Sequence, residues 1–378
     1  MEKTVTKTKI AQELMFVIGM WLLSRLVIVV AMQSLAPLLP ADLMQRHNPS
    51  LVAQQGWQSF AHWDGHTYRR IVTSGYEFVN DGKQHNVAFF PLFPFITRAV
   101  MTLGLPFEVA GTLVNNIAFL LALPLAYFWV KERQGIVAAR WTTVVLAWCP
   151  FSIFGTVTYT EGLFLLLSTA SLRAFDRSQY VWASMWGAMA TATRANGVAL
   201  IPTFLIVAWR ERRSAIAYVA AITAGTGLLL YILYCAIQFG DPLAFVQAQK
   251  GWQAKTGPNW LVWWQLFTQD LLGRKGLSTV FVALTKVVMV FGGGYLLWHL
   301  RSQIGRIVVV YGFCSLALIF YSGAILSVDR FSYGTVSLSI ALGTLLARHQ
   351  RWGYAVISLF ALMLVYFSVR FAWELWIG

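Results

Sequence analysis

Long apolar segments alternate with short polar links along most of the chain. The first, residues 14–32, is about 19 residues long, the length of a membrane-spanning helix. Further segments of roughly spanning length follow at 109–130, 136–155, 160–174, 180–193, 197–209, 214–237, 277–298, 307–326, 332–347 and 352–372. The pattern predicts an all-α polytopic membrane protein with about eleven transmembrane helices. The stretch 180–209 is consistent with two spans or with one long kinked helix.

One more apolar segment, 88–104 (AFFPLFPFITRAVMTLG), carries Pro91, Pro94 and Arg98. Whether it crosses the membrane decides which side every later link faces. If it does not cross, and the N-terminus is cytoplasmic, the cytoplasmic links are all basic; they are 131–140, 173–179, 210–213, 299–306 and 347–353. Because cytoplasmic links carry the excess of Lys and Arg in membrane proteins, we predict that 88–104 is a juxtamembrane or re-entrant helix.

This parity predicts a single transmembrane domain, residues 1–378, with two large extracytoplasmic loops. The first loop, 33–108, carries the juxtamembrane helices, and the second is 238–275. The basic N-terminus (MEKTVTKTKIAQE) precedes a run of spanning length without a convincing small-residue cleavage site, so we expect an uncleaved first helix. The expected location is the plasma (inner) membrane, with the N-terminus in the cytoplasm.

Composition agrees with this hydropathy pattern. The 378 residues are 58% hydrophobic and only 12% charged, whereas soluble domains average about 25% charged residues. The mean hydropathy is +0.61. A net charge of +14 could suit nucleic acid, but the hydropathy argues against that class, and the basic links account for the excess. The three cysteines lie far apart without a CxxC pair and define no disulfide framework.

A polar stretch interrupts the apolar chain at residues 60–76 (FAHWDGHTYRRIVTSGY). On the predicted topology it faces outward, as do Glu161 in GTVTYTEG, Arg194 in TRANG and Arg330 in SVDRF. Arginines in outer turns are unexpected once the basic links face inward. A planar guanidinium binds phosphate oxygens in pairs, so Arg194 and Arg330 are candidate phosphate ligands. The alternative is a snorkelling or ion-paired arginine, with Asp329 as a nearby partner for Arg330.

These features, in this order, resemble the membrane-embedded GT-C glycosyltransferases and, more narrowly, the PIG-V-like mannosyltransferases. The matching stretches are HWDGHTYRRIVTSGYEF (62–78), AFFPLFP (88–94), CPFSIFGTVTYTEGLFLLLS (149–168) and TRANG (193–197). The resemblance implies a GT-C-like bundle and inverting transfer of a sugar, mannose in this family, from a polyprenyl-phosphate donor. The resemblance also implies a lipid-linked or glycan hydroxyl as the acceptor, at the outer membrane face. By position, Asp64 corresponds to the acid of the first-loop motif.

The chemistry of such a transfer needs few groups. One carboxylate base must lie near the attacking hydroxyl, and cations must stabilise the departing phosphate. A phosphate leaves as an anion, so a second carboxylic acid is not obligatory. We therefore predict Asp64 as the general base; Glu161 could orient the acceptor, support Asp64 or help to bind a cation. Asp64 could instead be an N-cap residue of the helix that follows it.

Two histidines and a tryptophan flank Asp64. We expect His62, Trp63 and His66 to support the base or to contact the acceptor. Two histidines four positions apart also suit zinc, but Gly65 weakens a continuous helix there, and the nearby additional ligands are Glu77 and His85 in a loop. The sequence therefore predicts no metal or cofactor and leaves a divalent cation open.

The main rival function is a transporter or flippase of lipid-linked sugars. Such a protein also needs arginines for phosphate, but it usually has inverted repeats and polar residues near the bilayer midplane. The acids here cluster at one face, which favours an enzyme, whereas the intramembrane Arg25 and Lys286 keep the rival open. A zinc or serine hydrolase is disfavoured because HExxH and GxSxG do not occur. A structural subunit would not need acids and arginines on one side.

Overall fold

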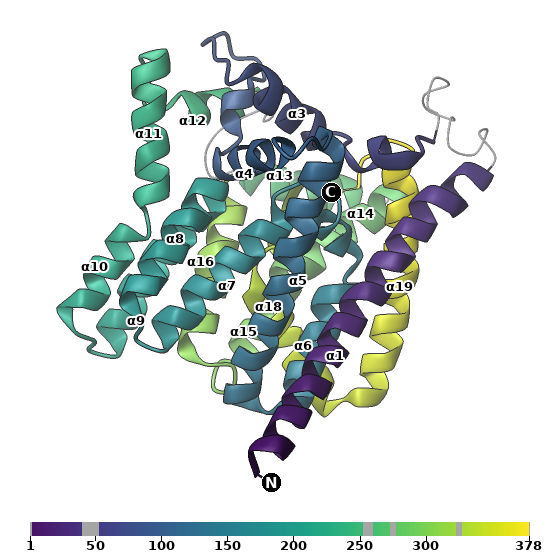
Figure 1. Cartoon of the computed structure of the whole chain (residues 1–378), viewed down its shortest axis with the longest axis vertical. Coiled ribbons are helices and arrows are strands. Elements are labelled where there is room, and N and C mark those ends of the chain that lie inside the picture. The colour runs from purple at the N-terminus through teal and green to yellow at the C-terminus, as the bar shows by residue number, and fades with distance from the viewer. Residues whose placement is uncertain (1, 40–52, 252–259, 273–276, 323–326, 378) are drawn as a thin grey trace.

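The computed structural model describes residues 2–39, 53–251, 260–272, 277–322 and 327–377, and within these ranges the chain is helical without a strand. The helices, several of which continue into short 3-10 or π turns, are α1 (Glu2–Val30), α3 (Asp64–Ser74), α4 (Leu92–Met101), α5 (Phe107–Gln134), α6 (Ile136–Trp148), α7 (Glu161–Asp176), α8 (Tyr180–Thr193), α9 (Leu200–Arg210), α10 (Ala215–Thr223), α11 (Thr226–Phe239), α12 (Ala244–Gln249), α13 (Trp260–Gln265), α14 (Leu277–Val287), α15 (Gly293–His299), α16 (Arg306–Ser322), α17 (Val328–Tyr333), α18 (Val336–Arg348) and α19 (Gln350–Ala372). Most of them run side by side along the long axis, and α3, α4 and α12 lie across the upper end (Figure 1).

Long apolar helices confirm that the protein is an integral membrane protein. Among the described residues, five helical segments are long and apolar enough to cross a bilayer; they are Lys9–Leu38, Phe107–Gln134, Ala215–Phe239, Val280–His299 and Gln350–Ala372. Shorter apolar helices pack among them, including α6, α16 and α18. The total of about eleven crossings stays a prediction. Parts of two predicted segments, 40–52 of the first loop and 252–259 with 273–275 of the second, lie outside the described residues, as do 323–326 of the predicted span 307–326.

The predicted span 136–155 is shorter as a helix than its apolar length suggested. Helix α6 ends at Trp148, and Pro150–Gly155 form a 3-10 helix, η6. Cys149 is extended, with φ −49° and ψ 136°. A residue before proline is disfavoured in the α conformation because of a clash with the proline ring, and Pro150 therefore stops the helix. The residues after Pro150 therefore form the connection from α6 to α7 at the upper end of the bundle.

The stretch 180–209 forms two helices that run in opposite directions. Helix α8 ends at Thr193, and the chain turns back through a short 3-10 helix, Ala195–Ala199, into α9. Phe204 in α9 stacks on Phe175 at the end of α7, at 4.0 Å between ring centroids, and Tyr180 at the start of α8 contacts the same ring. The start of α8 and the later part of α9 therefore lie at the same end, which settles the alternative left open by the sequence in favour of two helices.

The segment 88–104 does not contain a helix of spanning length. Its helix, α4, has 10 residues, which corresponds to about 15 Å against a hydrocarbon core of about 30 Å. It packs against α3 and the start of α5 at the upper end of the bundle (Figure 1). This placement agrees with the predicted juxtamembrane helix.

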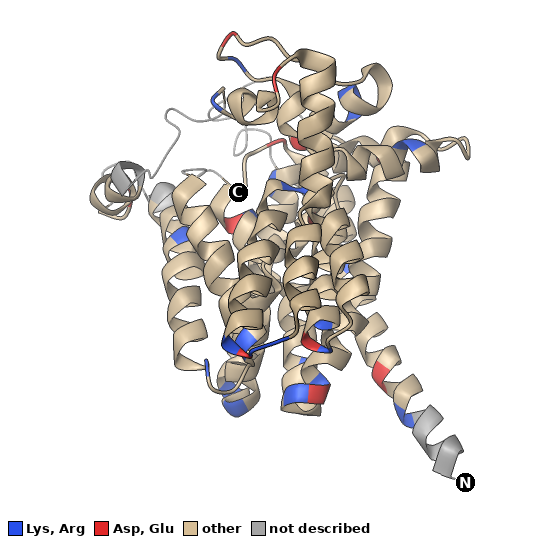
Figure 2. Cartoon of the chain, turned by 90° about the vertical axis from the view of Figure 1, so that its left-hand side faces the viewer, with Lys and Arg blue, Asp and Glu red and all other residues tan. Residues whose placement is uncertain are grey.

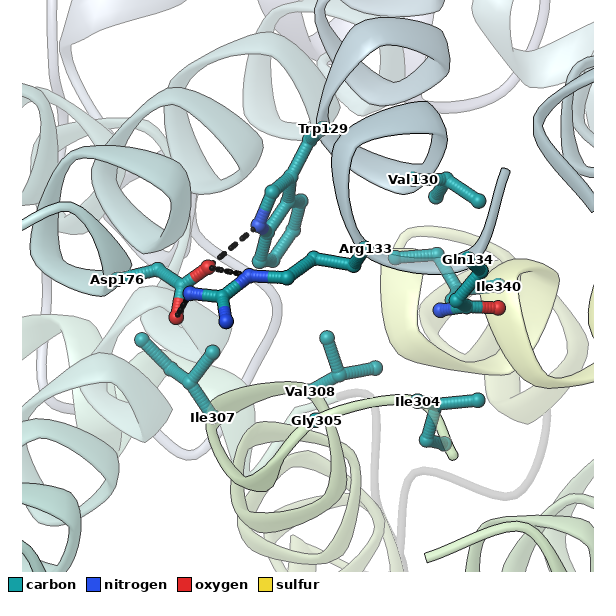
Figure 3. Close-up of a pocket in the computed structure, with 10 residues that line it drawn as sticks. All are labelled: Trp129, Val130, Arg133, Gln134, Asp176, Ile304, Gly305, Ile307, Val308 and Ile340. Carbon is teal, nitrogen blue, oxygen red and sulfur yellow. Dashed lines mark hydrogen bonds and ion pairs between the residues drawn. The ribbon is translucent and has the colours of Figure 1, made fainter. Parts of the chain in front are cut away.

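The basic links gather at the lower end of the bundle, as Figure 2 shows. Ion pairs connect them: Lys131 with Glu13 at 2.7 Å, Arg173 with Glu132 at 2.8 Å and Arg306 with Glu211 at 3.1 Å. Figure 3 shows one such junction, where Asp176 accepts hydrogen bonds from the Arg133 guanidinium and the Trp129 indole. The links that parity assigned to one side of the membrane therefore share one end of the molecule.

Candidate functional site

Four charged side chains predicted for the site meet at the end of the bundle opposite the basic links. Arg330 in α17 donates a hydrogen bond from Nη1 to Asp64 Oδ2 at 2.5 Å, and its Nε lies 3.1 Å from Glu161 Oε1. Arg194 Nη1 donates to the same oxygen of Glu161. Asp64, Arg330, Glu161 and Arg194 thus form a continuous row of alternating charges, which we call the charged cluster.

The members of the charged cluster differ in exposure. Glu161 is 1% exposed, and the side chains of Arg194 and Arg330 are nearly as buried, whereas the Asp64 side chain is 17% exposed. Burying an unpaired charge is costly, so each buried member needs an opposite charge beside it. Burial by itself lowers the pKa of Arg330, but Asp64 and Glu161 raise it above its ordinary value, and the guanidinium stays protonated. Asp64 is therefore the most exposed member of the charged cluster.

Aromatic rings line the arginines. The Arg330 Cζ lies 5.1 Å from the Tyr159 ring centroid, and the Arg194 Cζ lies 4.8 Å from the Phe331 ring centroid. The Tyr159 hydroxyl also accepts a hydrogen bond from the backbone N–H of Asp64 at 3.4 Å. Burial raises the pKa of Tyr159 well above its ordinary value, so the hydroxyl keeps its proton. Such rings fix the planar guanidinium groups without neutralising them.

The loop between α6 and α7 positions Glu161, and a buried arginine in α1 holds that loop. Arg25 donates hydrogen bonds to the Ser152 carbonyl at 2.8 Å and to the Thr156 hydroxyl at 2.6 Å. Arg25 therefore faces the bundle, one of the outcomes expected for an intramembrane arginine, and its partners are neutral oxygens of the loop.

Helix α5 and the first loop hold the same segment from the other side. The Asn115 carboxamide in α5 donates to the carbonyls of Phe154 and Val157 and accepts from the Gly162 N–H, each at 2.7 Å. A Cβ on Gly162 would lie 2.4 Å from the Asn115 carbonyl oxygen, so the close approach of the helices needs glycine there. Thr158 donates its N–H to the Phe60 carbonyl at 2.8 Å. These contacts fix the starts of α3 and α7 relative to each other.

The backbone is strained directly before Asp64. Trp63 has φ 53° and ψ −112°, a conformation that non-glycine residues rarely adopt and that costs about 1–3 kcal/mol. Trp63 occupies the N-cap position of α3, and Asp64 is the first helical residue. The alternative that Asp64 is the N-cap residue is therefore wrong, and its carboxylate instead accepts a hydrogen bond from Arg330.

The flanking residues His62, Trp63 and His66 contact the C-terminal part of the chain. His62 is buried and packs edge-on against Phe371, with ring centroids 5.6 Å apart, and Trp63 packs against Trp376 in the same way. Both histidines face Glu374 in the C-terminal segment. Burial lowers the pKa of His62 to about 4, although Glu374 opposes the shift, so its imidazole is neutral at neutral pH.

The suggested pairing of Arg330 with Asp329 is wrong. Asp329 pairs with Lys286 of α14 at 2.8 Å, and both side chains are buried. The two residues are neighbours in α17 and point to different partners. Lys286 was recognisable as an intramembrane charge in need of a partner, but the sequence did not indicate which acid would supply it. Tyr159 and Glu374 were also missed; Tyr159 lies within the matching stretch 149–168 but was not singled out, and no motif marks Glu374.

The comparisons with known proteins agree with this fold. The model of the family described as Mannosyltransferase (PIG-V) matches residues 10–253, more than half of the chain. Human GPI alpha-1,6-mannosyltransferase 2 is 24% identical over 246 residues, which cover 54% of this chain and 48% of that protein. The chain therefore spans about half the length of the curated relative it matches.

Solved membrane proteins share the helical architecture. ArnT from Cupriavidus metallidurans bound to undecaprenyl phosphate is 14% identical, with a TM-score of 0.55 over 91% of this chain and 62% of that chain. The oligosaccharyltransferase AglB from Archaeoglobus fulgidus, in complex with an inhibitory peptide and a dolichol-phosphate, is 12% identical, with a TM-score of 0.50 over 94% of this chain and 55% of that chain. These likenesses confirm the predicted GT-C-like fold.

We predict that Glu161→Gln destabilises the protein strongly, because it leaves two buried guanidinium groups without their shared counter-charge. Removing one partner of a buried ion pair costs about 3–5 kcal/mol. The measurement is the free energy of unfolding in detergent micelles. The control is Glu77→Gln, which breaks an exposed pair with Arg70 and should cost less than about 1 kcal/mol. Equal, small losses in both variants would show that Glu161 does not hold the cluster together.

Proposed function

The chain belongs to the PIG-V mannosyltransferase family, and from this premise we propose that it is an inverting GT-C glycosyltransferase. It transfers mannose from a polyprenyl-phosphate donor to a hydroxyl of a lipid-linked or glycan acceptor. The observation that carries the proposal is the charged cluster, in which one partly exposed carboxylate lies beside two buried arginines. The four residues come from elements far apart in sequence and meet at one end of the bundle.

Asp64 acts as the general base. Its carboxylate takes the proton of the acceptor hydroxyl, whose oxygen attacks the anomeric carbon of the sugar from the face opposite the phosphate. The bond between the anomeric carbon and the phosphate oxygen breaks, and its electron pair leaves with the polyprenyl phosphate. Base catalysis of this kind contributes about 10²–10⁴-fold to a rate. The partial exposure of Asp64 supports this role because the acceptor can approach it.

Arg194 and Arg330 bind the donor phosphate. Their guanidinium groups already lie within one row, held by Glu161 and by the aromatic rings, so they need little reorganisation when negative charge develops on the leaving group. Glu161 is too buried to act on the acceptor directly. It pairs with both arginines and so fixes the positions of their guanidinium groups relative to each other.

Donor binding frees the base. In the structure, the Asp64 carboxylate accepts a hydrogen bond from Arg330 Nη1 at 2.5 Å. A phosphate is a strong competitor for a guanidinium, so the donor takes the place of Asp64 on Arg330. Asp64 then turns its carboxylate toward the acceptor. Because of this exchange, Asp64 is available as a base only in the complex that contains the donor.

Charge balance supports the same order of events. Two carboxylates and two guanidinium groups make the cluster neutral. When Asp64 takes the acceptor proton, the cluster gains one positive charge. At the same step the phosphodiester becomes a phosphate monoester, which carries about −1.5 to −2 at neutral pH. The net charge of the cluster therefore changes from zero to +1 at the same step in which the leaving phosphate gains negative charge.

The class of donor has support from the shared fold. ArnT is described with undecaprenyl phosphate bound and AglB with a dolichol-phosphate, and both are similar in architecture to this chain. The name of the human relative gives mannose as the sugar that it transfers. A membrane-embedded carrier also fits a site that sits where apolar helices meet a loop layer.

We place the site on the extracytoplasmic face of the plasma (inner) membrane, with the N-terminus in the cytoplasm. The support is the separation of charges: the basic links lie at the lower end of the bundle (Figure 2), whereas Asp64 of the charged cluster begins α3, which lies across the upper end (Figure 1). Excess Lys and Arg mark the cytoplasmic side.

The transporter alternative loses its main support. Arg25 and Lys286 kept it open because intramembrane charges often mark a transport path. Arg25 instead holds the loop before Glu161, and Lys286 forms a buried pair with Asp329 next to Arg330. Both charged side chains therefore bind residues at the end of the bundle that contains the charged cluster.

We predict that Asp64→Asn abolishes transfer and leaves donor binding intact. The amide cannot take the acceptor proton, so the rate of polyprenyl-phosphate release from a radiolabelled mannosyl donor should fall about 10²–10⁴-fold. The control is Asp81→Asn, which removes a first-loop acid that pairs with His85 and should retain the wild-type rate. Transfer by Asp64→Asn at the wild-type rate would exclude Asp64 as the base, and loss of donor binding would assign it to binding instead.

A second prediction concerns the orientation in the membrane. A cysteine at Lys83, an exposed position of the first loop, should react with a membrane-impermeant maleimide on intact cells. A cysteine at Ser302, exposed at the basic end, should react only after permeabilisation. The wild-type chain controls for its own cysteines, of which Cys149 and Cys235 are buried. The reverse labelling pattern would place the site on the cytoplasmic side.

A further inference from the structure

Three metal-ligating side chains meet where the first loop touches the C-terminal segment. His62 and His66 flank Asp64, and Glu374 follows the last helix, α19. Their ligand atoms all lie within 4.8 Å of one another. His66 Nε2 is 3.3 Å from Glu374 Oε1, and His62 Nδ1 is 3.8 Å from the same oxygen. We call these three residues the His–His–Glu group.

The spacing of these atoms suits one tetrahedral ion. Two ligands bonded to zinc at about 2.0–2.1 Å lie about 3.4 Å apart in tetrahedral geometry. The separations of 3.3 and 3.8 Å are close to this value, so small side-chain movements suffice. Two imidazoles and one carboxylate are a donor set that zinc accepts and that magnesium and calcium do not favour.

The state of His62 points to a ligand as well. Its side chain is fully buried, and neither ring nitrogen has a hydrogen-bond partner within the described part of the chain. Buried polar side chains are nearly always hydrogen-bonded or bound to a ligand. His62 Nδ1 faces Glu374, the centre of the group.

We propose that His62, His66 and Glu374 bind one Zn²⁺ ion with a fourth position open to water. The side chains of His66 and Glu374 are 51% and 37% exposed, which gives the ion access from solvent. The ion joins the motif that contains Asp64 to a segment 308 residues away. It reinforces the contact between Trp63 and Trp376 and the bond from Arg370 to the Trp376 carbonyl. This site goes beyond sugar transfer and does not rest on it.

The sequence marked His62 and His66 as a pair that suits zinc, and chain topology explains why it did not identify the third ligand. Glu77 and His85 are the additional ligands that lie near the histidines in sequence. Both form other pairs: Glu77 pairs with Arg70, and His85 pairs with Asp81 at 2.7 Å. The third ligand comes from the far end of the chain. Glu374 has a φ of 54°, and the turn that this creates brings its carboxylate to the histidines.

Zinc binding to the purified full chain tests the proposal. The protein carries a tag without histidine, is stripped with a chelator and is titrated with Zn²⁺ against a competing chromophoric indicator. Wild type should bind one Zn²⁺ per chain. His66→Ala and Glu374→Gln should each weaken Zn²⁺ binding at least about 100-fold, since changes to outer-shell partners alone cost about 10–100-fold. The matched controls, His85→Ala and Glu77→Gln, should bind as wild type does.

Thermal unfolding provides a second readout. Zn²⁺ should raise the unfolding temperature of wild type and of both controls, because a ligand that binds only the folded state stabilises it. It should not raise that of His66→Ala or Glu374→Gln, which change exposed side chains and should fold. Absence of bound Zn²⁺ in wild type, or equal binding in the two ligand variants, would overturn the site. Loss of binding in His85→Ala would place the ion elsewhere and would overturn it too.

Discussion

The ion pair between Arg330 and Asp64 is the interaction on which the site depends. A guanidinium buried among apolar helices costs several kcal/mol unless opposite charges surround it, and here the charges come from Asp64 and Glu161. The first loop, the start of α7 and α17 must therefore converge on one point. Arg25, Asn115 and Thr158 fix the loop that makes this convergence reproducible.

The same pair connects the buried charges to the most exposed member of the charged cluster. Arg330 donates a hydrogen bond to Asp64, so the partly exposed carboxylate has an opposite charge beside it. Glu161 stays between the two arginines, and its burial makes it the fixed member of the row. The exchangeable contact is then the one at the exposed end. In the mechanism proposed above, a phosphate that replaces Asp64 would bind a preorganised arginine, and the carboxylate would become available as a base.

Much of this arrangement could be predicted from the sequence because charge parity orders the helix ends. The basic links placed Asp64, Glu161, Arg194 and Arg330 at one face, and the structure brings all four together, although their roles stay predictions. Parity does not say which helices are lateral neighbours. For that reason the pairing of Lys286 with Asp329, and the approach of Glu374 to His62, could not be predicted. The end of α6 was missed because its apolar run continues past Pro150, where the backbone leaves the helix.

The central claim is that the donor phosphate replaces Asp64 on Arg330. The most direct measurement is a structure of the protein with a non-hydrolysable mannosyl polyprenyl phosphonate bound. The phosphonate oxygens should then lie within hydrogen-bonding distance of Arg194 and Arg330, and the hydrogen bond from Arg330 Nη1 to Asp64 should be broken. A phosphonate bound away from these arginines, with the ion pair between Arg330 and Asp64 intact, would contradict the proposed mechanism.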